Sequence, residues 1–370
     1  MQCLVEITQS IYQLIYKINK MRKLNQVIVL VVLAIVTVTS CKDNELPKGA
    51  YESGVLVINE GNFSDADGSL SYFNPNTAIV ETNVFSKVNN GAILGDIVQS
   101  VTVNNDVAYV IVNNSNKVEV INAHTLESIT SFDAALPRYM TIANGKGYLT
   151  EWGADFATPR VKVIDLSNHT VQSEIIVESG AEQIVTAKGK VYVANSWSNT
   201  ISVIDPSTDQ VITNIATNFW GISGLSVDKD ENVWGVYAGS TNWTVTPSVA
   251  NNDGAIVKVN TIDDAVTSST SVGLNVSSKV AMNSTGDKLL YMAGNSVYGF
   301  STADMTSVEI INESTAIHFY GIGVDPATDI IYTGDDKGFQ GNGVVFRYNL
   351  DGTAIDSFDV GRGPNGFVFK

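Results

Sequence analysis

Three glutamates stand at the ends of short apolar runs, and they are the first residues to consider for chemistry. Glu60 and Glu151 directly follow such runs, in the segments NEG and TEWG, and Glu182 comes at the start of another run. Two carboxylates about 5–10 Å apart can hydrolyse a glycosidic bond. The chain holds 38 acidic residues, so each glutamate is equally well explained as a solvated or hydrogen-bonded group. A hydrolase or lyase that uses Glu60, Glu151 or His318 therefore stays open as an alternative.

The three histidines, His124, His169 and His318, are far apart in the sequence. No metal triad and no Ser-His-Asp set can be assembled from them. The segment 65–69 (DADGS) resembles half of a calcium loop but lacks the glutamate that closes an EF-hand, so a turn explains it better. The sequence therefore predicts no metal site, no cofactor and no assigned catalytic residue.

The sequence contains a repeated pattern of strands and turns, and this pattern determines where these residues lie in the fold. The stretch 191–215 (VYVANSWSNTISVIDPSTDQVITNI) alternates short β-branched runs with polar turns, which is typical of antiparallel strands. Equivalent runs recur around Val57, Tyr109, Tyr148, Tyr192, Trp234, Tyr291 and Tyr332, at intervals of 39 to 57 residues by subtraction. A period near 40–50 residues is typical of four-stranded propeller blades.

The last residues of the chain supply the strand that the first repeat lacks. Val55 begins as a second strand, whereas 361–369 (GRGPNGFVF) has the form of a first strand with its entry loop. Pairing these two segments would close the ring and remove an exposed sheet edge. We therefore expect an all-β, seven-bladed β-propeller over residues 55–370, closed by the C-terminal strand.

The motifs YVAN, NTISVID and G-x-G-P-x-G (Gly361 to Gly366) resemble the YVTN-repeat, YncE-like β-propeller family. The resemblance covers residues 55–369 and is strongest in the fourth repeat. It implies the propeller fold, and a fold alone does not give a function.

Aromatic residues gather in the connections of one predicted face. Four of the five tryptophans fall there, and a large, partly apolar ligand would suit such a surface. The alternative is that some of these rings pack between neighbouring blades. The predicted ligand-binding residues are Phe63, Tyr139, Trp152, Trp197, Trp220, Trp243, Tyr320 and Phe339. The long connection 239–254 is expected to border this surface.

Charge excludes one class of partner. The net charge is −16, and residues 1–40 carry four basic residues against one acidic residue, a net +3, so the remainder carries −19. Such a surface repels phosphates, and nucleic acid is not an expected ligand.

The N-terminal region resembles that of a bacterial lipoprotein. We expect translation to start at Met21, followed by the apolar run 27–38 and a lipobox that ends at Cys41, the predicted site of lipidation. The residues 42–45 (KDNE) resemble the export tag of surface-exposed Bacteroidetes lipoproteins. An ordinary secretory signal and a plain acidic linker are the alternatives. The expected organisation is a signal region over 1–40, a lipidated linker over 41–54 and the propeller over 55–370.

Anchor, tag and repeat together resemble propeller lipoproteins that capture corrinoids, the vitamin B12 class, at the outer membrane. The resemblance implies a small-molecule ligand, no catalysis and a TonB-dependent outer-membrane transporter as partner. No ligand-specific motif supports the corrinoid. An enzyme and a scaffold for another cell-envelope protein remain the alternatives.

Overall fold

The computed structural model describes residues 12–13, 16–17, 49–242, 249–273 and 275–370. The chain divides into the units 1–48 and 49–370, and every strand of the described residues belongs to the second unit. Cys41, Trp243 and most of the predicted signal region lie outside the described residues. Among the described residues, no helix is long and apolar enough to span a membrane.

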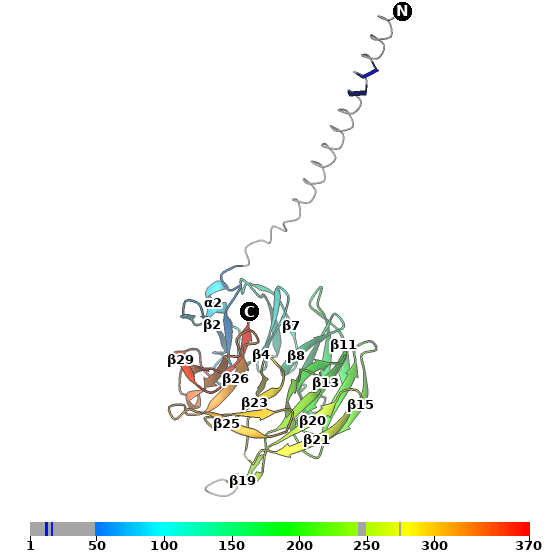
Figure 1. Cartoon of the computed structure of the whole chain (residues 1–370), viewed down its shortest axis with the longest axis vertical. Helices are drawn as coiled ribbons and strands as arrows, with labels where there is room; N and C mark the ends of the chain where they lie inside the picture. The colour runs from blue at the N-terminus through cyan, green and yellow to red at the C-terminus, as the bar shows by residue number, and fades with distance from the viewer. Residues whose placement is uncertain (1–11, 14–15, 18–48, 243–248, 274) are drawn as a thin grey trace, which may run out of the picture. The chain divides into compact units, whose positions relative to one another are not determined.

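Seven antiparallel sheets of four strands each surround one axis, which confirms the predicted seven-bladed β-propeller (Figure 1). The first strands of neighbouring blades contact one another in an unbroken ring of β30, β4, β8, β12, β16, β22 and β26. Each fourth strand lies at the periphery, as the labels β15, β21, β25 and β29 show in Figure 1.

The strands of each blade follow one another from the axis outward. Blade 1 contains β30 (Pro364–Phe369), β1 (Val55–Asn59), β2 (Ser69–Asn74) and β3 (Ile79–Glu81). Blade 2 contains β4 (Val98–Asn104), β5 (Val107–Val112), β6 (Lys117–Asn122) and β7 (Ser128–Asp133). Blade 3 contains β8 (Pro137–Ala143), β9 (Lys146–Glu151), β10 (Arg160–Asp165) and β11 (Thr170–Ile176).

The remaining blades follow the same order. Blade 4 contains β12 (Ala181–Ala187), β13 (Lys190–Asn195), β14 (Thr200–Asp205) and β15 (Gln210–Ala216). Blade 5 contains β16 (Ile222–Val227), β17 (Val233–Tyr237), β20 (Ala255–Asn260) and β21 (Ala265–Ser271). Blade 6 contains β22 (Val280–Met282), β23 (Lys288–Ala293), β24 (Ser296–Ser301) and β25 (Ser307–Asn312). Blade 7 contains β26 (Phe319–Val324), β27 (Ile331–Asp335), β28 (Val344–Tyr348) and β29 (Ala354–Asp359).

Short elements interrupt several of the connections. Helix α2 (Val84–Val88) precedes β4, and the 3₁₀ turn η1 (Lys337–Phe339) follows β27. The long connection predicted over 239–254 contains a two-stranded hairpin of β18 (Ser240–Asn242) and β19 (Val249–Asn252), which was not predicted from the sequence.

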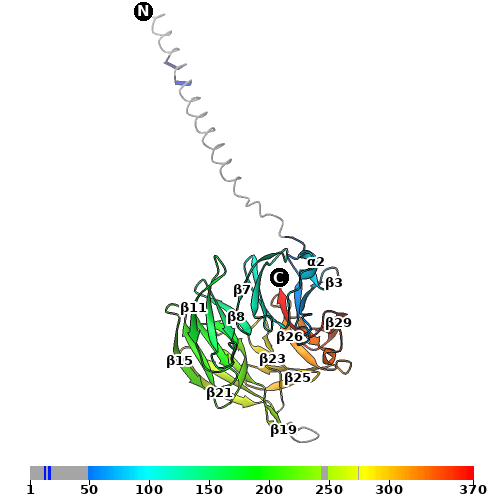
Figure 2. The same cartoon turned by 180° about the vertical axis from the view of Figure 1, so that it is seen from behind.

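The C-terminal strand closes the ring, as predicted. β30 pairs antiparallel with β1, with Phe369 opposite Val55, and Figure 2 shows the C-terminus beside blade 1 from the reverse side. The rings of Phe367 and Phe369 pack against Tyr332 of blade 7, with centroids 5.6 and 5.2 Å away. The last strand therefore joins two blades that lie at opposite ends of the sequence.

Buried aromatics of the second strands connect neighbouring blades. Tyr148 and Tyr192 are fully buried, and their hydroxyls donate to Asp209 and Asp264 in the outer turns of the next blade, at 2.6 and 2.7 Å. Both aspartates have positive φ angles, 55° and 50°, which short polar side chains tolerate. The repeat of an aromatic near every 40 residues thus marks a contact between blades as well as a core position.

Removing the Phe369 ring should weaken the closure. We expect Phe369→Ala to lower the free energy of unfolding by about 2 kcal/mol, because the ring is partly buried against Tyr332. Urea denaturation measures the effect, and Phe156→Ala, at a ring that is 52% exposed, is the matched control. Equal effects of the two substitutions would show that β30 does not hold the ring closed.

Candidate functional site

β-Bulges at the start of the first strands turn polar side chains toward the axis. In six blades the register between first and second strand shifts at this point, and a bulge redirects the unpaired side chain. The residues skipped by the pairing are Gln99, Arg138, Tyr139, Glu182, Gln183, Ser223, Tyr320 and Asn365. Lys279 comes directly before β22 of blade 6, the blade without such a shift. We call Glu60, Gln99, Arg138, Glu182, Lys279, Tyr320 and Asn365 the axial ring.

Arg138 and Glu182 form the most fully bonded part of the axial ring. The guanidinium donates from Nη2 to Glu182 Oε1 at 2.6 Å and from Nη1 to Gln99 Oε1 at 2.6 Å. It also lies 4.0 Å over the ring of Trp152, whose Nε1 donates to Glu182 Oε2 at 3.1 Å. Because the Glu182 charge favours the protonated form, the pKa of Arg138 is raised despite burial. Trp152 is thereby fixed against the axial ring.

Glu60 organises the opposite part of the axial ring. Its Oε2 accepts hydrogen bonds from Tyr320 Oη at 2.8 Å and Asn365 Nδ2 at 2.9 Å. Lys279 Nζ lies 3.8 Å from the same oxygen and 3.5 Å over the Tyr320 ring, without a hydrogen-bond partner in the described part of the chain. Burial lowers the pKa of Lys279 to about 8, and burial also raises the pKa of Tyr320. Glu60 thus joins residues of blades 6 and 7 to the C-terminal strand β30.

Glu151 does not join this ring. Pairing places Glu151 opposite Pro137, whereas Asn59, the residue before Glu60, is opposite Pro364, so the expected equivalence of Glu60 and Glu151 is wrong by one residue. Successive side chains of a strand point to opposite faces. Glu151 is 1% exposed and forms ion pairs with Arg160 and Lys162 of β10, at 3.2 and 3.4 Å. Its position favours a structural role.

Three aromatic rings form a cluster beside Arg138. Trp152 and Trp197 lie 5.1 Å apart between centroids, and Phe156 lies 6.1 and 5.9 Å from them. The three residues come from the β9–β10 and β13–β14 connections, which open at the same end of the ring. We call them the aromatic cluster. It offers apolar surface directly next to the axial charges.

The other predicted residues are spread around the same end. Tyr139 accepts a hydrogen bond from Gln99 Nε2 at 2.9 Å, and Phe63 is 68% exposed between β1 and β2. Trp220 is 67% exposed and borders a hollow of about 400 Å³ with Phe219 and Tyr237.

Tyr320, Phe339 and His318 form a second aromatic group near the axis. Tyr320 and Phe339 meet edge to face at 5.3 Å, and His318 lies 6.3 Å from Tyr320. His318 Nδ1 lies 3.2 Å from Asp336 Oδ2, and this hydrogen bond raises the pKa of His318. Gly363, with φ of 63°, lies against Phe339, because a Cβ there would come within 2.6 Å of the ring. The G-x-G-P-x-G segment thus fits under an aromatic residue of the neighbouring blade.

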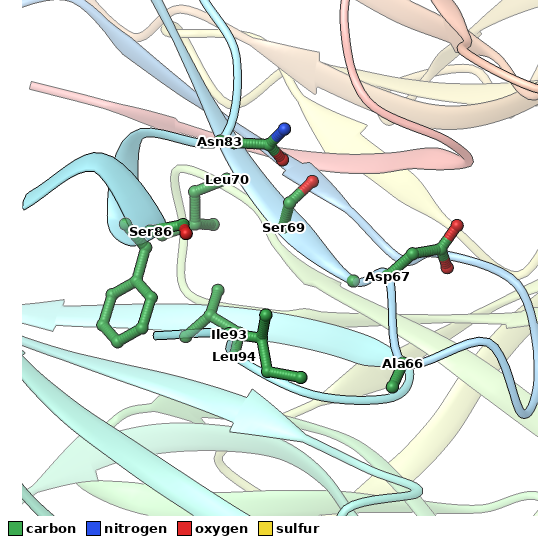
Figure 3. Close-up of a pocket in the computed structure, with 10 residues that line it drawn as sticks. Ala66, Asp67, Ser69, Leu70, Asn83, Ser86, Ile93 and Leu94 are labelled. Carbon is green, nitrogen blue, oxygen red and sulfur yellow. The ribbon is translucent and has the colours of Figure 1, made fainter. Parts of the chain in front are cut away.

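A separate hollow lies at the edge of blade 1. It measures about 290 Å³ and is lined by residues from the β1–β2 connection, β2, α2 and the segment before β4 (Figure 3). Leu70, Ile93 and Leu94 make its apolar side, and Asp67, Ser69 and Asn83 its polar side. None of the predicted ligand-binding residues lines it.

The turn expected over 65–69 lies earlier, at residues 63–65, and Ser69 already begins β2. Asp65 and Asp67 both lie near Arg362 Nη1, at 2.7 and 3.0 Å. Within the described ranges, no group of three histidine, cysteine or acidic residues could hold a metal ion.

Four residues of the axial ring, Gln99, Arg138, Lys279 and Asn365, were not predicted from the sequence as site residues. Each stands within two residues of the start of a first strand, and so do Glu182 and Tyr320. An alignment of the repeats on the starts of their first strands, rather than on the second-strand aromatics, would have predicted that these residues meet at the axis.

The buried amine of Lys279 should make stability depend on pH. Its pKa of about 8 lies below the usual value of about 10.4, so the unfolded chain binds more protons between these pH values and stability rises with pH. Relative to Lys279→Met, we expect the wild type to gain on the order of 1–3 kcal/mol between pH 7 and pH 10. Urea denaturation of both proteins across this range measures the gain.

Lys229→Met is the matched control, because Lys229 is exposed beside Asp230. A difference between wild type and Lys279→Met that stays constant with pH would contradict the burial of the amine.

Several solved structures have similar folds at low sequence identity. The periplasmic gluconolactonase of Pseudomonas aeruginosa is 10% identical with a TM-score of 0.64, covering 85% of this chain and 98% of that chain. A quinonprotein alcohol dehydrogenase-like protein of Bacteroides thetaiotaomicron is 14% identical with a TM-score of 0.62, covering 86% and 78%. The hydrazine synthase of Kuenenia stuttgartiensis is 16% identical with a TM-score of 0.59, covering 75% and 92%. At such identities the likeness shows the fold alone.

The family comparison is more specific. No curated protein matches the chain. A family model described as "Domain of unknown function (DUF5074)" matches residues 53–369, the whole propeller. The resemblance to YVTN repeats remains a prediction beside this match. The chain belongs to the DUF5074 family.

Proposed function

We propose that this protein is a lipid-anchored surface protein that captures a large, partly apolar ligand at one end of its propeller. This is the end where the connections between second and third strands open, and we call it the loop end. The proposed ligand is a corrinoid, and the proposed recipient is a TonB-dependent outer-membrane transporter. The anchor at Cys41, the surface location and the transporter are supported by the sequence patterns of the N-terminal region only. The binding surface has support from the geometry.

The observation that carries the proposal is the contact between the aromatic cluster and the axial ring. Trp152 packs on Trp197 and at the same time lies under the Arg138 guanidinium. A ligand at this place would meet flat apolar surface beside charged and hydrogen-bonding groups. Such a combination suits a large molecule with an apolar body and a polar edge.

The enzymatic alternative has weaker support. Glu151 is bound to Arg160 and Lys162, and Glu60 is bound to Tyr320 and Asn365. His318 is oriented by Asp336. Glu151 therefore stands apart, and Glu60 and His318 are linked through Tyr320 and not directly, so these contacts do not join the three residues in one constellation.

Truncation of either indole in the aromatic cluster should weaken ligand binding. We expect Trp152→Ala and Trp197→Ala to lower the affinity for cobinamide at least tenfold, about 1.4 kcal/mol, because each ring would lose its contact area with the ligand. Isothermal titration calorimetry with the full-length protein measures this change.

Ile262→Ala is the control, since Ile262 is 78% exposed in the β20–β21 turn at the other end of the ring. Unchanged affinity in both tryptophan variants, with tight binding by the wild type, would place the site elsewhere. No binding of cobinamide by the wild type would remove the corrinoid from the proposal.

A further inference from the structure

The imidazole of His318, at the loop end, is hydrogen-bonded through one ring nitrogen and is half exposed. His318 Nδ1 lies 3.2 Å from Asp336 Oδ2, and the Asp336 side chain is 5% exposed whereas that of His318 is 51% exposed. The backbone is fixed as well, because the His318 N–H donates to Asp335 Oδ1 at 3.1 Å. The ring therefore has a defined position and an accessible edge.

The Asp336 carboxylate determines which ring nitrogen is free. A carboxylate only accepts hydrogen bonds when ionised, so Nδ1 carries the proton that it donates to Asp336. The neutral imidazole then has its lone pair on Nε2, on the edge away from Asp336. A carboxylate behind the other nitrogen is the usual support of a metal-binding histidine.

The other two histidines differ from His318 in exposure or in partner. His124 also has a carboxylate partner, with Nε2 2.8 Å from Asp106 Oδ1, but its free Nδ1 is buried. His169 Nδ1 is bonded to Tyr109 Oη at 2.9 Å. Both belong to turns between third and fourth strands, at the end opposite to the aromatic cluster. His318 is thus distinguished by its exposure and by its place.

A lone imidazole does not bind a free metal ion firmly, and the described residues contain no group of three potential ligands. It suffices, however, for a metal whose other positions are filled by the ligand itself. A planar macrocycle with a central transition metal leaves only its axial positions open to a protein.

The surroundings of His318 suit the flat face of such a macrocycle. Tyr320 lies 6.3 Å from the imidazole, and Phe339 contacts Tyr320 at 5.3 Å. Ile317, the preceding residue, is 65% exposed. Apolar groups therefore flank the imidazole.

We propose that His318 Nε2 is the axial ligand of the metal in a macrocyclic ligand bound at the loop end. The inference rests on the proposed capture function and names the metal contact within that site. In the binding step the Nε2 lone pair forms the bond to the metal as a bound water leaves, and no oxidation state changes. Cobalt corrinoids and iron porphyrins share this chemistry.

Absorption spectroscopy tests the assignment directly. Aquocobinamide and ferric protoporphyrin are each titrated into the full-length protein, because replacement of axial water by imidazole shifts their absorption bands. We expect the shift with the wild type for one of the two probes and its loss in His318→Ala, with affinity lowered about 10- to 100-fold. His169→Gln is the control and should keep the shift.

Two further measurements separate coordination from a structural effect. Added free imidazole should restore the shifted spectrum of the complex with His318→Ala. Asp336→Asn should lower the affinity about tenfold, because Asp336 positions His318 and does not contact the metal.

The outcomes distinguish this inference from the capture function. Binding of aquocobinamide by the wild type without a shift, or with a shift that survives in His318→Ala, overturns the metal contact and leaves capture intact. A His318-dependent shift with the porphyrin alone supports the contact and removes the corrinoid. No binding of either probe overturns the metal contact and removes the corrinoid from the capture proposal, which is then tested by the tryptophan variants with other ligands.

Discussion

The structure depends on the close contact of seven first strands around one axis. These strands approach so closely that glycine is required where two of them meet. A Cβ on Gly224 would lie 2.1 Å from the Ser278 carbonyl oxygen, and one on Gly321 would lie 2.6 Å from that of Pro364. Larger side chains are accommodated where the strands begin, at the bulges that form the axial ring. The packing that closes the propeller thus also determines where its polar residues gather.

Closure brings together residues from distant parts of the chain. Glu60 follows β1 near the beginning of the propeller, and Asn365 belongs to β30 at its end, yet they share a hydrogen bond. Lys279 from blade 6 and Tyr320 from blade 7 reach the same carboxylate. A local change in β30 would therefore affect both the stability of the ring and the composition of the site.

The sequence predicted the fold closely because the repeat is a property of local pattern. The stretch 191–215, expected to alternate strands with polar turns, spans β13, β14 and β15 to within one residue at each end. The closing strand was predictable because blade 1 lacked a first strand. The aromatic residues could be assigned to connections by their offset from the buried anchors.

The axial ring could not be predicted in the same way. Its residues share a place in space, and their types differ, from Gln99 and Arg138 to Lys279. Bulges bring these residues together where first strands crowd at the axis, and local pattern contains no signal for a bulge. Glu151 was expected beside Glu60 because Val57 was aligned with Tyr148. The pairing makes Leu56 the equivalent residue, since Leu56 lies opposite the fourth residue of β2 as Tyr148 lies opposite the fourth residue of β10.

A crystal structure of the protein with bound cobinamide would test the central claim most directly. The claim is that the aromatic cluster and the axial ring form one ligand-binding surface at the loop end of the ring. It predicts the ligand over Trp152 and Trp197, with polar groups toward Arg138 and Glu182. A ligand bound at the opposite end, near His124 and His169, or in the hollow at the edge of blade 1 would contradict it.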